Sequence, residues 1–200
     1  PSDKVLARNT LIKASNFTGN FTPSINGENL IIDIRGEIIN YPVEEGAIFN
    51  ITRSSGSREK NPAVSPDGKQ VAFISDKTGE EEIYLADLEG KTEWKQLTKG
   101  GKGFREQLVW SPDGKYIVFH DKFMKLNLVD AATGKIKVIS KSDYDDSWYN
   151  WGIRDYTWST DSKWIAYAKL DQSLYQSIFI YSIDADKEYR VTSSITQDWS

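Results

Sequence analysis

The chain has 200 residues, of which 38% are hydrophobic and 27% charged, and its formal net charge is −4. No basic stripe accompanies that charge, and no apolar run approaches the roughly 20 residues that cross a bilayer, so we expect neither nucleic acid nor a membrane as partner. The chain contains no cysteine, which excludes a disulfide framework, a thiol nucleophile and thiolate-bound zinc.

A five-residue turn recurs along the chain. It reads Ser65-Pro66-Asp67-Gly68-Lys69 and returns as Ser111-Pro112-Asp113-Gly114-Lys115, a period of about 45 residues. Weaker copies are Ser24-Ile25-Asn26-Gly27-Glu28 and Ser159-Thr160-Asp161-Ser162-Lys163. Pro presets φ, Asp or Asn bonds back to nearby backbone, and Gly accepts a left-handed conformation. Each copy therefore predicts a tight turn between two antiparallel strands, and its Ser and Asp are predicted to serve the turn.

The residues around each turn predict four strands. The first strand precedes the turn, at 61–65, 107–111 and 155–159. The second follows it, at 30–34, 71–74, 116–119 and 164–167. The third is at 37–43, 83–86, 126–129 and 178–183, and the fourth at 48–52, 95–98, 137–140 and 189–192. The second and third strands are almost continuously apolar, which indicates a sheet that is covered on both faces.

Four-stranded units with this period, each buried between its neighbours, are typical of a β-propeller. We therefore predict an all-β fold, part of a β-propeller of about four four-stranded antiparallel blades. The predicted divisions are a linker or incoming strand at 1–20, blades at 21–56, 57–100, 101–141 and 142–193, and the start of a truncated blade at 194–200. Since the end blades would expose apolar faces, we expect residues 1–200 alone to self-associate.

Several motifs are more specific than the turn. They lie at 36–39, 52–59, 61–68, 97–101, 108–113 and 153–159, and include Asn61-Pro62-Ala63-Val64-Ser65-Pro66-Asp67-Gly68 and Ile153-Arg154-Asp155-Tyr156-Thr157-Trp158-Ser159. With these motifs in order along nearly the whole chain, the sequence resembles the second propeller of tricorn-type proteases. The turn alone also occurs in TolB and in the propellers of prolyl oligopeptidases.

The resemblance implies a seven-bladed propeller within a longer serine protease, where it filters or guides peptides and supports the protease domains. None of that family's catalytic residues maps onto this chain. The implied partners are peptides and other domains of the parent chain, with a homo-oligomer as a further expectation, and the expected compartment is the cytoplasm or, as the alternative, the periplasm. Two other interpretations remain: a TolB-like interaction scaffold, and the propeller of a prolyl-oligopeptidase-type peptidase.

No complete catalytic or metal site is expected in this chain, and no cofactor. The only histidine is His120, predicted at the end of a strand, where a structural role is favoured over that of a catalytic base. The acidic group Asp143, Asp145 and Asp146 lacks the EF-hand pattern and is interpreted as a solvated loop. Glu80-Glu81-Glu82 is likewise assigned to a loop.

The connections after the second and fourth strands of each blade should emerge together on one rim of the ring. This rim is rich in basic residues and carries aromatic residues in its longest loop. We predict that it contacts peptide or a neighbouring domain, because aromatic and arginine side chains dominate such interfaces. The candidate contact residues are Arg58, Arg105, Trp148, Tyr149, Trp151 and Arg154.

Overall fold

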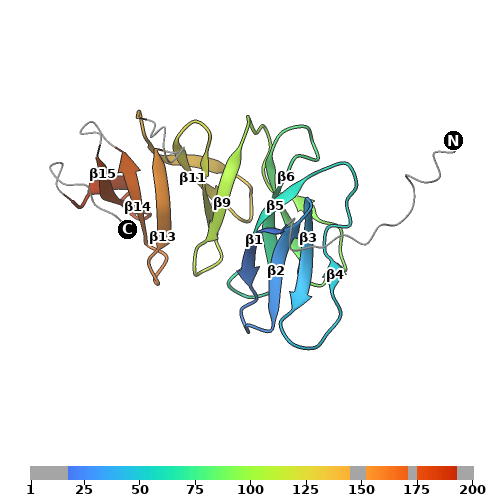
Figure 1. Ribbon diagram of the computed structural model, residues 1–200. Coiled ribbons are helices and arrows are strands. Elements are labelled where there is room, and N and C mark those ends of the chain that lie inside the picture. Colours follow the sequence, from blue (N-terminus) through green and yellow to red (C-terminus); the bar gives the residue numbers. More distant parts are fainter. Residues whose placement is uncertain (1–17, 145–151, 171–174, 193–200) are drawn as a thin grey trace.

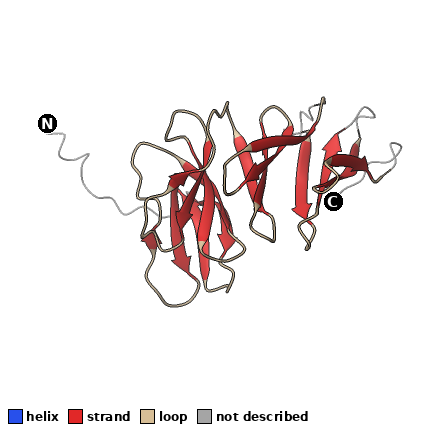
Figure 2. Cartoon of the chain, turned by 180° about the vertical axis from the view of Figure 1, so that it is seen from behind, coloured by secondary structure: helices blue, strands red, loops and turns tan. Residues whose placement is uncertain are grey.

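The computed structural model describes residues 18–144, 152–170 and 175–192. Every regular element in these residues is a β-strand, and the strands form four antiparallel sheets of four strands each. The sheets follow one another in chain order, from blue to red in Figure 1, and Figure 2 shows them from behind. The predicted succession of propeller blades is confirmed. In the described part of the chain, no helix is long and apolar enough to cross a membrane.

Within each blade the strands pair in chain order. Blade 1 comprises β1 Thr18–Pro23, β2 Asn29–Ile34, β3 Glu37–Pro42 and β4 Phe49–Asn50. Blade 2 comprises β5 Glu59–Val64, β6 Gln70–Ser75, β7 Glu82–Asp87 and β8 Lys95–Gln96. Blade 3 comprises β9 Arg105–Trp110, β10 Tyr116–Asp121, β11 Lys125–Asp130 and β12 Ile136–Lys141. Blade 4 comprises β13 Ile153–Trp158, β14 Trp164–Leu170, β15 Gln176–Ser182 and β16 Lys187–Arg190.

The outermost strands of blades 1 and 2 are shorter than the sequence suggests, with two residues each in β4 and β8. In both, as in blade 4 with its four-residue β16, a threonine lies two residues beyond the strand. The Ile38 N–H donates to Thr52 Oγ1 at 3.1 Å, and the Ile83 N–H donates to Thr98 Oγ1 at 2.9 Å. Because a hydroxyl satisfies the amide that a strand carbonyl would otherwise bind, the ladder need not continue.

The repeated turn has the predicted chemistry in every blade. In blade 2, the Ser65 hydroxyl lies 2.6 Å from Asp67 Oδ1 and accepts the Gln70 N–H at 3.0 Å. The corresponding bonds form in blades 1, 3 and 4. Gly68 has φ +70°, and Ser162, which takes the glycine's place in blade 4, has φ +60°. These serines and aspartates therefore serve the turns, as the sequence predicts.

The apolar core lies between the blades, in three clusters. Ile31 and Ile38 of blade 1 pack with Phe73 of blade 2, and similar clusters join blade 2 to blade 3 and blade 3 to blade 4. Phe21 in blade 1 is 66% exposed, and Trp164 in blade 4 is 38% exposed. Self-association of residues 1–200 alone stays a prediction.

The first strand of each blade lies next to the first strand of its neighbour, so β1, β5, β9 and β13 are the inner strands. A tryptophan at the end of β9 and of β13 secures these contacts. Trp110 Nε1 donates to the Ala63 carbonyl at 3.0 Å, and Trp158 Nε1 donates to the Val109 carbonyl at 3.3 Å. Carbonyls on the free edge of an inner strand are thereby satisfied by the following blade.

Candidate functional site

The connections between strands form two rims at opposite ends of the blades, because successive antiparallel strands alternate in direction. We call one the turn rim; its residues are 24–28, 43–48, 65–69, 88–94, 111–115, 131–135, 159–163 and 183–186. The other is the loop rim; its described residues are 35–36, 51–58, 76–81, 97–104, 122–124, 142–144, 152, 175 and 191–192, together with Lys141 at the end of β12. The sequence prediction concerns the loop rim.

The two rims carry opposite charge. The exposed acidic residues of the turn rim are Glu28, Glu44, Glu45, Asp67, Glu89, Glu93, Asp113, Asp161, Asp184 and Asp186. Its exposed basic residues are Lys69, Lys91, Lys115, Lys135 and Lys163. The exposed basic residues of the loop rim are Arg35, Arg53, Arg58, Lys77, Lys99, Lys102, Lys122 and Lys141, against the exposed acids Asp76, Glu80 and Asp143. The loop rim is therefore the basic end of the described propeller.

Glu80, Glu81 and Glu82 determine the shape of the loop rim beside blades 2 and 3. Each carboxylate accepts one backbone N–H from the connection into β9. Glu82 accepts from Gly101 at 2.5 Å, Glu80 from Gly103 at 2.7 Å and Glu81 from Arg105 at 2.7 Å. The sequence assigned these consecutive glutamates to a loop; the structure places Glu82 at the start of β7, and all three bind the connection into the next blade.

Arg105 is used inside this arrangement and is only 5% exposed. Its guanidinium lies 2.9 Å from the Glu82 carboxylate and donates to Thr98 Oγ1 at 2.8 Å. Burial lowers the pKa of Arg105, and neighbouring Glu82 acts in the opposite direction. The expectation of Arg105 as an accessible contact residue is thus corrected: its charge is satisfied within the fold.

The other candidate contact residues have different positions. Arg58 is exposed on the loop rim, and its backbone N–H donates to Asp76 Oδ1 at 2.8 Å. Arg154 is half-buried on β13, where its Nε donates to Gln176 Oε1 at 2.9 Å. Trp148, Tyr149 and Trp151 lie outside the described residues, so the predicted contact role of these three side chains stays a prediction.

The aromatic side chains exposed on the described loop rim are ones that sequence reasoning missed. They are Phe104, Phe123, Tyr144 and Tyr175. Phe104 is 57% and Phe123 43% exposed, although both lie in short polar connections. A phenylalanine next to a basic residue and outside every predicted strand was the signal that could have identified Phe104 and Phe123.

A groove of mixed polar and apolar lining follows the inner strands, with a volume of about 600 Å³. Asn61 and Glu106 line it and are bonded to each other, with Asn61 Nδ2 donating to Glu106 Oε2 at 2.6 Å. Lys60 Nζ lies 2.8 Å from Glu106 Oε1 and 3.0 Å from Glu81 Oε1. Arg154 lines the same groove from blade 4. Charges of both signs therefore face the space enclosed by the inner strands.

His120 also lines this groove, but its environment does not suit a catalytic base. It is 5% exposed on β10, and its Nδ1 lies 3.2 Å from the Tyr156 hydroxyl. Burial lowers the pKa of His120 to about 4, so the ring is neutral at pH 7. Among the described residues no cluster of His, Cys, Asp or Glu could hold a metal ion; Asp143 pairs with Lys141, and Asp145 and Asp146 lie outside them.

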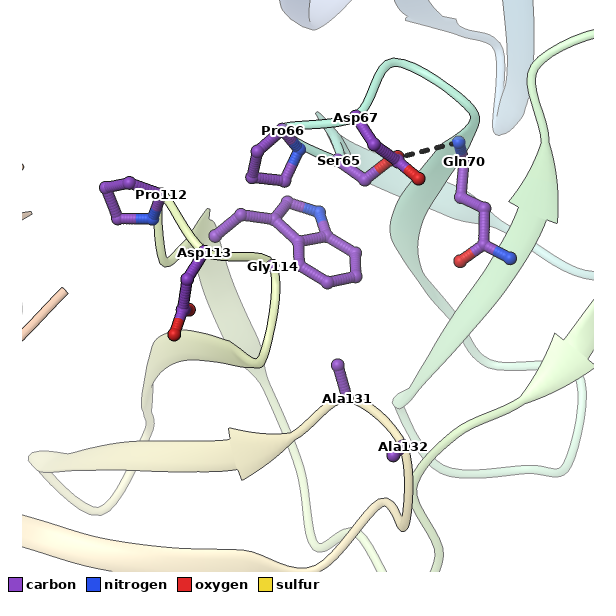
Figure 3. Close-up of a pocket in the computed structure, with 10 residues that line it drawn as sticks. Ser65, Pro66, Asp67, Gln70, Pro112, Asp113, Gly114, Ala131 and Ala132 are labelled. Carbon is purple, nitrogen blue, oxygen red and sulfur yellow. Dashed lines mark hydrogen bonds between the residues drawn. The ribbon is translucent and has the colours of Figure 1, made fainter. Parts of the chain in front are cut away.

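A second pocket, of about 490 Å³, lies on the turn rim between blades 2 and 3. Figure 3 shows its lining, in which the turn of Ser65, Pro66 and Asp67 faces the turn that contains Pro112 and Asp113. The dashed line marks the bond by which Ser65 Oγ accepts the Gln70 N–H. Its Ser and Asp groups are engaged in the turns, so we prefer the groove and the loop rim as the functional site.

Comparisons with known proteins agree with this architecture. Residues 18–200 match the tricorn protease second beta propeller domain, and the chain belongs to that family. It is 25% identical over 201 residues to a Tricorn-like protease C-terminal subunit of Sulfurisphaera tokodaii, covering 100% of this chain and 22% of that protein.

Two solved structures share the fold. The crystal structure of the tricorn protease superposes with a TM-score of 0.78 at 21% identity, over 94% of this chain and 18% of that chain. TolB from Acinetobacter baumannii superposes with a TM-score of 0.64 at 24% identity, over 90% of this chain and 43% of that chain. The chain thus spans about a fifth of the length of its tricorn-type relatives.

Proposed function

We propose that this chain is a non-catalytic propeller segment of a tricorn-like serine protease, and that it guides peptides along its inner strands toward protease domains elsewhere in the parent protein. The observation that carries the proposal is the groove between the inner strands, where Glu106 and Arg154 present charges of both signs. An extended peptide can exchange its own charged side chains between such groups without binding tightly to any of them.

The interior of the groove supports passage rather than chemistry. His120 is neutral and in contact with Tyr156. The carbonyls of Ala63 and Val109 on the inner strands already accept indole N–H groups. A peptide therefore finds few free backbone partners at these positions, which disfavours its incorporation as an extra strand.

The test is to obstruct the groove in the complete protein. Because this chain contains no cysteine, a single Gln107→Cys substitution introduces a unique thiol here, and Gln107 is an exposed residue that lines the groove. Any cysteine elsewhere in the parent would first be replaced. We expect attachment of a bulky maleimide polymer at this thiol to reduce the turnover of long peptides strongly.

The matched control is Val138→Cys, at an exposed position on the outermost strand β12, modified with the same polymer. Turnover in this control should equal that of the unmodified protein. Equal turnover in both polymer-modified proteins would contradict the proposed route through the propeller.

A second candidate function is that of a TolB-like scaffold, which binds another protein through its rim. The exposed aromatic residues of the loop rim favour it. This function predicts a parent chain that ends soon after the ring closes, whereas the first predicts a long parent with downstream Ser and His. The intact mass of the native protein distinguishes the two. The first function would place the protein in the cytoplasm, and the scaffold would leave the periplasm as the alternative.

A further inference from the structure

Two exposed phenylalanines lie side by side on the loop rim of blade 3. Phe104 ends the connection into β9, and Phe123 lies in the turn between β10 and β11. The Lys122 N–H donates to the Phe104 carbonyl at 3.1 Å, which links the two segments. A Cβ at Gly103 would lie 2.3 Å from Lys122 Cε, so the lysine side chain lies directly on this glycine. We call Phe104, Phe123, Lys102 and Lys122 the Phe104–Phe123 patch.

The patch offers two ammonium groups, because the nearby carboxylates keep their negative charge but are directed at backbone N–H groups. Glu80 and Glu81 accept the N–H groups of Gly103 and Arg105, and Asp121 accepts the Phe123 N–H at 2.9 Å. Within the described part of the chain, no carboxylate lies within ion-pair distance of Lys102 or Lys122. These two ammonium groups are therefore available to a ligand.

Lysine ammonium groups also lie beside both rings. Lys122 Nζ is 5.1 Å from the centroid of the Phe123 ring, and Lys60 Nζ is 5.5 Å from that of Phe104. When a carboxylate of a ligand binds one of the patch lysines, an apolar side chain next to that carboxylate in the ligand is consequently placed on an exposed ring. The chemistry that fits is an acidic group adjacent to an apolar one.

The position of the patch identifies the kind of ligand. Phe104 directly precedes the inner strand β9, and Lys60 belongs to the inner strand β5. Lys60 is in turn bonded to Glu106, which lines the groove. A molecule on the patch therefore lies at the entrance to the groove, where a peptide that enters it must pass, rather than on the outer part of the blade.

We propose that the Phe104–Phe123 patch is a docking site at the mouth of the groove for peptides in which a carboxylate neighbours an apolar side chain. This inference rests on the proposed function, because it specifies which peptides the propeller admits first. The aromatic rings bind the apolar side chain, and Lys102 and Lys122 bind the carboxylate and attract acidic peptides by charge.

The experiment measures fluorescence anisotropy of labelled decapeptides with the complete protein at 4 °C. Three peptides of equal length are compared: one of Glu and Leu, one of Lys and Leu, and one of Glu and Gly. We expect the Glu–Leu peptide to bind most tightly. Phe104→Ala with Phe123→Ala should weaken its binding about tenfold, the equivalent of about 1.4 kcal/mol. Lys102→Glu with Lys122→Glu should remove the preference for the Glu–Leu peptide over the Lys–Leu peptide. In the unmodified protein, 0.5 M salt should weaken this preference.

The matched control is Lys115→Glu with Lys163→Glu, which makes the same charge change on exposed lysines of the turn rim. Unchanged binding of the Glu–Leu peptide in this control supports a local site, whereas a loss equal to that in the patch variant would reduce the effect to net charge and overturn the proposal. Equal binding of all three peptides would also overturn the proposal. So would a single-stranded RNA decamer that displaces the labelled Glu–Leu peptide better than the unlabelled Glu–Leu peptide does.

The two proposals fail in different ways. If the Gln107→Cys polymer blocks turnover but the patch variants bind the Glu–Leu peptide normally, the docking site is wrong and guidance through the groove stands. If the patch variants lose the peptide while the polymer leaves turnover unchanged, the route through the groove is wrong and the patch remains a peptide site on the rim.

Discussion

At the turn rim the turn after the first strand repeats one set of contacts in every blade, whereas at the loop rim blades 1, 2 and 4 share a threonine contact and the blades otherwise differ. Ser65, Ser111 and Ser159 bond to the same relative atoms, with distances that agree within 0.1 Å for each type of bond. On the loop rim, the third strand begins with a glutamate bonded to a threonine in blades 1 and 2, Glu37 and Glu82, but with Lys125 in blade 3 and Gln176 in blade 4. Of these four residues, Glu82 pairs with a buried arginine.

This difference separates the contacts that stabilise every blade from the contacts that make one part of the surface unlike the rest. A contact that recurs in every blade serves the blade itself, and the turn aspartates show this electrostatically. The hydrogen bond from Ser65 lowers the pKa of Asp67, and that from Ser159 lowers the pKa of Asp161, so both turns keep their charge in mild acid. Contacts that occur once in the described blades, such as the bonds of Glu80 and Glu81 to backbone N–H groups and the Glu82–Arg105 pair, shape a surface that only one part of the described ring has.

The largest expected effect is the loss of Glu82. Glu82→Ala leaves the Arg105 guanidinium buried without its carboxylate, and should lower the free energy of unfolding of the propeller by about 3–5 kcal/mol. The corresponding change in blade 3, Lys125→Ala, should stay within about 1 kcal/mol, because Lys125 is half-buried and forms no such pair. Denaturant unfolding followed by tryptophan fluorescence measures both; equal losses would remove the distinction between blades at this rim.

A second effect concerns the groove behind the loop rim and depends on pH. The pKa of His120 is lowered by burial to about 4 in the folded state, against 6.5 as the ordinary value. The unfolded chain therefore binds more protons between these two values, and stability is lost as the pH falls from about 6.5 to 4. The loss should reach about 3 kcal/mol. His120→Gln should flatten the dependence of unfolding on pH in this window, and an unchanged slope would show that other groups cause it.

The same contrast explains how far sequence reasoning reached. The turn and the two buried strands after it repeat, so their chemistry was predictable from each copy. The shortness of β4 and β8 was not, since it depends on where Thr52 and Thr98 bind the neighbouring strand. At the loop rim, sequence placed Arg58, Arg105 and Arg154 on one rim but could not show that Glu82 withdraws Arg105 from the surface. It also could not show that the segments of Phe104 and Phe123 are joined by a backbone hydrogen bond.

A smaller and uniform effect is expected at the turn rim. Ser65→Ala, Ser111→Ala and Ser159→Ala each remove one acceptor for a backbone N–H and one donor to an aspartate. Each should lower the free energy of unfolding by about 1 kcal/mol, with the three values close together. A large difference among these variants, measured by the same denaturant unfolding, would contradict the interpretation that all blades use this turn alike.

The smallest effect is expected for the Phe104–Phe123 patch, and it tests whether these rings serve the fold at all. Phe104→Ala with Phe123→Ala should change the free energy of unfolding by no more than about 0.5 kcal/mol per substitution, since both side chains are substantially exposed. Phe119→Ala provides the comparison: this ring is 2% exposed in the same blade, and its loss should cost about 3–5 kcal/mol.

If the double variant instead approached the loss seen for Phe119→Ala, the exposed rings would be part of the core. Weakened peptide binding in that variant would then reflect a damaged blade. Stability close to that of the unmodified protein, together with the loss of the Glu–Leu peptide, would separate recognition from folding at this rim.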